Sequence, residues 1–169
     1  MLVLGIGLGV GFFLTQLHSP SAPPLPATTD LAPAPIASAW QSMIHAGQPP
    51  SDVLDNMVVP ARATVSGFHN RDQGVGQYDR GVDFVVPATP TDVEGFYGAE
   101  LPAVGWRIRA VAYTADRLGR QVLAYRFSRD SYEWDAKIEI DPVSGGTSAG
   151  TTAGTRLSVE LYQVSDDEG

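Results

Sequence analysis

The chain of 169 residues contains no cysteine, and this absence removes several classes of function. Without thiols there is no disulfide bond, no thiolate metal site, no cysteine nucleophile and no lipid attached through cysteine. Basic residues are also scarce, since 11 Lys and Arg stand against 19 Asp and Glu, for a formal net charge of −8. Nucleic-acid binding needs clustered cations to replace phosphate counterions, so this balance argues against a nucleic-acid partner.

Histidine is scarce too, and the sequence contains none of the common catalytic motifs. The three histidines are His18, His45 and His69, and no two have the spacing of metal ligands. Serine-hydrolase, zinc-protease and phosphate-loop motifs are absent. Residues 70–81 partly match a calcium loop, but Val75 and Gly81 stand where that loop needs Gly and Glu. We therefore predict no catalytic, cofactor-binding or metal-binding residues, and no cofactor.

Charge is missing altogether from residues 1–17, which are almost entirely apolar. As a helix they would span about 26 Å, close to the roughly 30 Å of a bilayer's hydrocarbon core. We predict a transmembrane signal-anchor helix over residues 1–19, a single pass through the cell membrane that leaves the C-terminal domain extracytoplasmic. A cleaved signal peptide is the alternative, because the small residues Ser19 and Ser21 precede Ala22. A buried core helix is the third.

The predicted membrane helix lacks a basic flank and is rich in glycine. No Lys or Arg precedes Arg62, so the segment inserts on hydrophobicity alone or a basic stretch lies upstream of this start. Its glycines form two overlapping Gly-x-x-x-Gly pairs, which let two membrane helices approach closely. They are Gly5, Gly7, Gly9 and Gly11. This spacing is compatible with a homodimer, although glycine is also common in membrane helices generally.

Proline is concentrated just after this segment, where eight of the 13 prolines lie in residues 20–50. Such a stretch favours an extended chain, so we predict a flexible Pro/Ala-rich linker there. Within it, residues 37–46 could form a short helix with Trp40 on its apolar face, lying on the membrane or docked on the domain. The folded unit should then begin between Ser51 and Pro60.

Beyond the linker, alternation of apolar and polar residues predicts six strands. The clearest is 132–141, where aromatic and aliphatic residues alternate with charged ones at every second position. The six predicted strands are residues 63–68, 82–86, 106–113, 121–128, 132–141 and 156–163. An antiparallel sheet with one face on a core and one in water is typical of this pattern.

One helix is predicted between the second and third strands. Thr89 and Asp92 form a capping box around Pro90, and an apolar stripe follows at helical spacing. Pro102 should kink or shorten the helix, and Gly105 should end it. The predicted fold is therefore α+β, with the order ββαββββ, a largely antiparallel sheet and one helix on its face. It forms an extracytoplasmic domain over residues 51–164, followed by an acidic tail at 165–169.

The passage from this helix into the next strand resembles a pattern, FYxxxLPxxGW, of uncharacterised membrane-anchored actinobacterial proteins. Phe96, Tyr97, Leu101, Pro102, Gly105 and Trp106 carry it. Ten Arg to one Lys is in keeping with a high-GC genome of that kind. The resemblance covers about residues 60–164 and implies the fold and the anchored layout. It brings no activity and no site residues.

Carboxylates are the only plentiful reactive groups, and four of them alternate along one predicted strand. They are Glu133, Asp135, Glu139 and Asp141. Two could act as the acid pair of a glycosidase, but the pattern is more typical of a solvated face balanced by Lys137 and Arg156. We therefore predict a non-enzymatic, membrane-anchored extracytoplasmic domain that binds a protein or cell-envelope partner. The alternatives are an envelope hydrolase using paired carboxylates such as Glu133 and Asp135, and a dimeric structural spacer.

Overall fold

The computed structural model describes residues 31–40, 49–71, 78–113, 119–128, 133–143 and 154–164. The predicted membrane helix (1–19), its four glycines and the acidic tail (165–169) lie outside these residues. Within them, no helix is long and apolar enough to cross a membrane. The predictions about the anchor and the glycine-mediated dimer therefore stay predictions.

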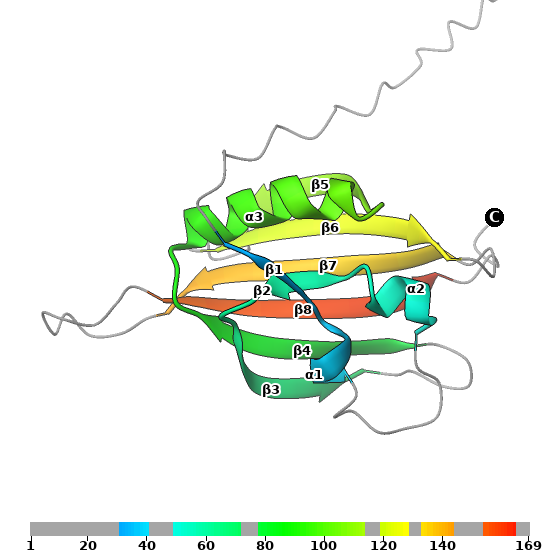
Figure 1. Ribbon diagram of the computed structural model, residues 1–169, viewed down its shortest axis with the longest axis horizontal. Helices are drawn as coiled ribbons and strands as arrows, with labels where there is room; N and C mark the ends of the chain where they lie inside the picture. Colours follow the sequence, from blue (N-terminus) through cyan, green and yellow to red (C-terminus); the bar gives the residue numbers. More distant parts are fainter. Residues whose placement is uncertain are drawn as a thin grey trace, which may run out of the picture.

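Six antiparallel strands form the main sheet in the order β3-β4-β8-β7-β6-β5 (Figure 1). They are β3 (Thr64–Asn70), β4 (Asp79–Val86), β5 (Arg107–Tyr113), β6 (Arg120–Phe127), β7 (Glu133–Pro142) and β8 (Thr155–Val164). Every predicted strand overlaps one of these, so the α+β class and the largely antiparallel sheet are confirmed. The helix α3 (Pro90–Ala103) carries the chain from β4 to the far edge at β5, and β8 enters last, between β4 and β7.

The start of α3 is held by the predicted capping box. The Thr89 side chain accepts a hydrogen bond from the Asp92 backbone N–H at 3.2 Å. In return, the Asp92 carboxylate accepts from the Thr89 backbone N–H at 3.3 Å. Two of the otherwise unpaired N–H groups at the helix N-terminus are satisfied in this way.

The end of α3 is a Schellman turn. Gly105 has a φ of 91°, a left-handed conformation that favours glycine, and its N–H donates to the Pro102 carbonyl at 3.2 Å. Trp106 N–H donates to the Leu101 carbonyl at 2.9 Å, and both of these side chains are buried. Pro102 lies in the last turn, and the helix continues to Ala103, one residue beyond it.

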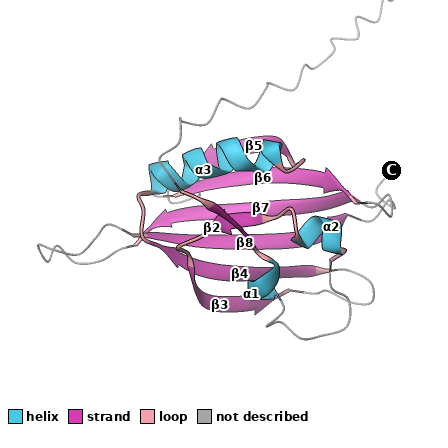
Figure 2. Cartoon of the chain, viewed as in Figure 1, coloured by secondary structure: helices cyan, strands magenta, loops and turns pink. Residues whose placement is uncertain are grey.

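A second, smaller layer lies on the same side of the sheet as α3 (Figure 2). The strand β1 (Pro33–Pro35) pairs antiparallel with β2 (Val58–Pro60), and the short helices α1 (Ala37–Trp40) and α2 (Ser51–Leu54) flank this ribbon. The buried core lies between this layer, α3 and the sheet. Its largest fully buried side chains are Trp40, Trp106, Tyr97, Phe84, Phe96, Ile36, Met57, Leu101, Ile138, Ile140, Leu157 and Leu161.

The folded unit therefore reaches further toward the N-terminus than the sequence predicted. Residues 33–40 fall within the predicted flexible linker and before the predicted boundary, yet Ile36 and Trp40 are completely buried. Trp40 Nε1 also donates a hydrogen bond to the Tyr78 hydroxyl. Proline is compatible with a strand that pairs on one side only, so a Pro-rich segment can form β1 without losing ladder hydrogen bonds. Of the helix predicted over 37–46, only residues 37–40 are described, and they form α1, whose Trp40 is buried in the core of the domain.

Candidate binding face

The two faces of the main sheet differ in what covers them. Every described element outside the sheet lies on one side, in front of it in Figure 1. No described element lies over the opposite side, which we call the open face. Its residues alternate along the strands with buried core residues, as the Cα register shows. The polar and aromatic ones discussed below are His69, Asp79, Asp83, Arg107, Arg109, Gln121, Tyr125, Phe127, Glu133, Asp135, Lys137, Glu139, Ser158, Glu160 and Tyr162.

At the centre of the open face, Glu160 accepts hydrogen bonds from two cations. Lys137 lies directly opposite it on β7 and pairs with its carboxylate. Arg71, which follows β3, reaches the same carboxylate at 3.2 Å. Lys137 also lies 3.9 Å from a Glu139 carboxylate oxygen. Only 5% of the Glu160 side chain is exposed, so these pairs are screened from water more than an ordinary surface ion pair.

Asp79 on β4 forms a carboxyl pair with Glu160. Burial, the hydrogen bond between the two groups and the Glu160 charge together raise the pKa of Asp79 from 3.8 to about 6. Burial alone would also raise the pKa of Glu160. Hydrogen bonds from Lys137 and Asp79, with the charges of Lys137 and Arg71, outweigh burial and lower that pKa. The pair therefore holds its first proton on Asp79, at a pH where an ordinary aspartate is ionised.

A second cluster surrounds Asp135, one strand away. Arg109 on β5 contacts the carboxylates of both Asp135, at 3.1 Å, and Glu133. Tyr162 on β8, opposite Asp135 in register, hydrogen-bonds to it. Burial raises the pKa of Asp135, the Arg109 charge opposes this, and the Glu133 charge adds to it. Burial and the Asp135 charge likewise raise the pKa of Tyr162 to about 12.

These contacts change the interpretation of the predicted carboxylate strand. We expected a uniformly solvated face, but Asp135 is only 6% exposed. The predicted role of Lys137 in balancing charge is confirmed, although its main partner, Glu160, comes from the neighbouring strand. Asp141 lies opposite Arg156 in the β7–β8 register. Neighbouring long side chains cover the inner carboxylates, because adjacent strands of a sheet lie only about 4.8 Å apart.

Sequence reasoning missed Asp79 and Arg109 as members of the face, and it placed Tyr162 outward on its strand without predicting its contact with Asp135. Each stands at an outward position of its strand, which was the available signal, but the partners of each lie 24 or more residues away. Around the edges, Gln121 donates to Glu139 at 3.1 Å and the His69 ring lies 3.7 Å from Asp83.

The chemistry of this face is that of paired charges. Within the described part of the chain, no group of three His, Asp or Glu side chains could hold a metal ion. Both predicted acid residues, Glu133 and Asp135, are bound by one guanidinium. The face therefore presents cations and anions in fixed positions.

Comparison with known proteins adds no functional assignment: no family model, curated protein or solved structure matches this chain. The resemblance to the actinobacterial pattern accordingly stays a prediction.

Proposed function

We propose that the open face is the binding surface of a non-enzymatic, extracytoplasmic domain, held at the cell membrane by residues 1–19. Its partner is a protein or another component of the cell envelope. The observation that carries this proposal is the open face itself. It is a sheet surface free of other described elements, whose charged side chains are held in place by one another.

Pre-paired charges suit such a surface. Complementary positive and negative positions favour one partner and one register over others, because a like charge placed opposite any of them is unfavourable. Arg109, Lys137 and Glu160 are immobilised by contacts across the strands, so binding a partner costs little further side-chain entropy. The aromatic rings of Tyr125 and Phe127 at one margin provide the apolar contact that interfaces commonly use.

The hydrolase alternative has less support from the same contacts. A general acid must hold a proton and a nucleophile must be accessible, but Arg109 occupies the two carboxylates that this mechanism would use. The dimeric spacer remains an alternative, and a self-cross-link in the experiment below would support it.

The proposal is tested by site-specific photo-cross-linking in intact cells. A photoreactive amino acid is placed at Ser158, in the middle of the open face, or at Ala99, an exposed position on α3 that serves as the control. We expect a discrete cross-linked species from position 158 and none from position 99. Identical adducts from both positions, or none from either, would contradict binding through the open face.

The membrane part of the proposal needs its own test. Protease added to intact cells should digest the domain if it is extracytoplasmic, and cell fractionation should find the whole chain in the membrane. Full protection of the domain in intact cells, with digestion after lysis, would overturn the proposed location without affecting the binding face.

A further inference from the structure

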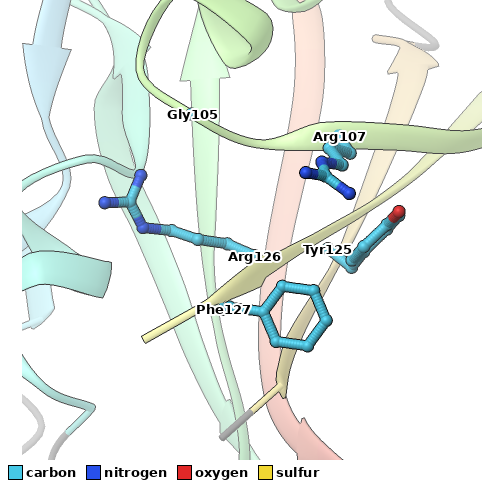
Figure 3. A pocket seen from close by; sticks show the side chains of 5 residues that line it. All are labelled: Gly105, Arg107, Tyr125, Arg126 and Phe127. Carbon is cyan, nitrogen blue, oxygen red and sulfur yellow. The ribbon is translucent and has the colours of Figure 1, made fainter. Parts of the chain in front are cut away.

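A small cavity of about 230 Å³ lies where β5 begins beside the end of β6 (Figure 3). Gly105, Arg107, Tyr125, Arg126 and Phe127 line it. Figure 3 shows the side chains of Arg107, Tyr125 and Phe127 close to one another, whereas the Arg126 guanidinium extends the other way. Arg126 donates to the Val104 carbonyl, and a Cβ added to Gly105 would lie 2.7 Å from its Nη1. Arg126 therefore forms part of the cavity wall, and Arg107 is the cation that a ligand in the cavity could contact.

No acidic side chain of the described residues neutralises the charge of Arg107. Its guanidinium carbon lies 6.0 Å from the centre of the Tyr125 ring, and no carboxylate of the described residues forms an ion pair with it. Arg109, two residues on, lies 4.8 Å from the same ring but is bound to two carboxylates. Arg107 is exposed, and none of the acidic residues that the structure describes neutralises it. Its guanidinium can bind a planar anion by donating two parallel N–H···O hydrogen bonds.

The rest of the lining is aromatic. The rings of Tyr125 and Phe127 lie edge to face, with centroids 6.1 Å apart, and Phe127 is 56% exposed although it is a large apolar side chain. An exposed phenylalanine beside a cation is a favourable surface for another ring. The cavity is smaller than the roughly 300–1,000 Å³ typical of pockets for drug-sized ligands, so it suits a single ring with one charged group.

We propose that this cavity binds an aromatic carboxylate, with the carboxylate on Arg107 and the ring against Tyr125 and Phe127. The ligand is either a free small molecule or the C-terminal residue of a peptide, since both present the same group. The cavity lies at the margin of the open face and shares Tyr125 and Phe127 with the surface proposed for the partner, but the two proposals are tested separately. Failure to bind carboxylates would leave the cross-linking result unaffected, and the reverse also holds.

The test is fluorine NMR of 4-fluorophenylacetate titrated with the full chain in a non-ionic detergent, where 4-fluorophenylacetamide is the uncharged counterpart. A ligand of this size should bind with a Kd on the order of 1 mM. We expect the amide to bind at least about tenfold more weakly, and Arg107→Gln to weaken acid binding to a similar extent. Phe127→Ala should weaken the binding of both the acid and the amide.

Arg156→Gln is the matched control, because it removes the same charge from an exposed position two strands from β6. It should leave binding unchanged, and circular dichroism should show that all three variants are folded. Equal binding of acid and amide, or unchanged binding by Arg107→Gln, would overturn the proposal. Gly-Gly-Phe with a free or an amidated C-terminus distinguishes a peptide from a small molecule as the ligand. Binding that is at least about tenfold tighter than that of 4-fluorophenylacetate, and that depends on the free carboxylate, indicates a peptide. Binding that is no tighter indicates a small molecule.

Discussion

Replacing Asp79 by asparagine should make the protein more stable at neutral pH and leave it little changed in acid. The folded protein binds a proton on Asp79 with a pKa of about 6, whereas the unfolded chain binds it with an ordinary value of 3.8. A carboxyl whose pKa is raised on folding favours the folded state at low pH. That contribution is lost as the pH rises from about 4 to about 6. At pH 7.5 the wild-type protein therefore carries two adjacent carboxylates, and the asparagine variant carries one.

The magnitude follows from the two pKa values. At about 1.4 kcal/mol per pKa unit, the difference between them sets an upper limit of about 3 kcal/mol. Asp79 is only half-buried and water screens its charge, so we expect a gain of about 1 kcal/mol at pH 7.5, or about 4 °C in Tm. The asparagine amide can still donate to Glu160. The lowered pKa of Glu160 acts in the opposite direction, because its contribution is lost as the pH falls through its folded value. Because the two carboxyls interact, the comparison measures the contribution of Asp79 together with its effect on Glu160.

The assay is urea denaturation of the full chain in a non-ionic detergent, followed by circular dichroism at pH 4.0 and pH 7.5. Asp83→Asn is the control, since it removes the same charge from the same face of β4 and leaves the carboxyl pair intact. An equal gain in stability for Asp79→Asn at both pH values, or the same pH-dependent gain for Asp83→Asn, would contradict a raised pKa of Asp79 as the cause.

Three further substitutions test the packing by the same denaturation assay. Trp40→Ala should cost about 3–5 kcal/mol, because it empties a fully buried site in residues 33–40. Gly105→Ala should cost about 1–2 kcal/mol, because its φ is 91° and the new Cβ would lie 2.7 Å from Arg126 Nη1. Lys137→Met should cost about 2 kcal/mol, because it leaves the buried carboxylate of Glu160 with only part of its compensating charge.

Each of these has a milder counterpart. Tyr78→Phe removes only the hydroxyl that accepts from Trp40 and should cost about 1 kcal/mol. Gly98→Ala, inside α3, should be neutral or stabilising by up to about 1 kcal/mol. Arg62→Met removes an exposed cation outside the sheet and should change little. A Trp40→Ala protein as stable as Tyr78→Phe would show that residues 33–40 do not belong to the folded unit.

The sequence predicted those parts of the fold whose causes lie close together along the chain. The alternation that defines β7 and the box of Thr89 with Asp92 are both complete within ten residues. The strand β1 was missed because its prolines favour an extended linker equally well, and only pairing with β2, more than 20 residues away, distinguishes the two.

The open face was predicted as a surface but not as an arrangement. Glu160 stands at an ordinary outward position in the alternating pattern of β8. Its burial follows from the register that places Lys137 opposite it, together with Arg71, which follows the more distant strand β3. Register depends on the packing of the whole core, so the alternating pattern of one strand does not reveal which outward charges lie opposite one another.

The position of β8 in the sheet has a consequence for how the protein is made. Of the described strands, β8 is the last to be synthesised, yet it joins the β3–β4 hairpin to the β5–β6–β7 meander and contributes Leu157, Val159 and Leu161 to the core. Until it arrives, β4 and β7 each present an unpaired edge on which other chains could assemble. A nascent chain that stops before residue 154 therefore has two separate halves. The six-stranded sheet is completed only after β8 has been synthesised, in a step that depends on contacts distant in sequence.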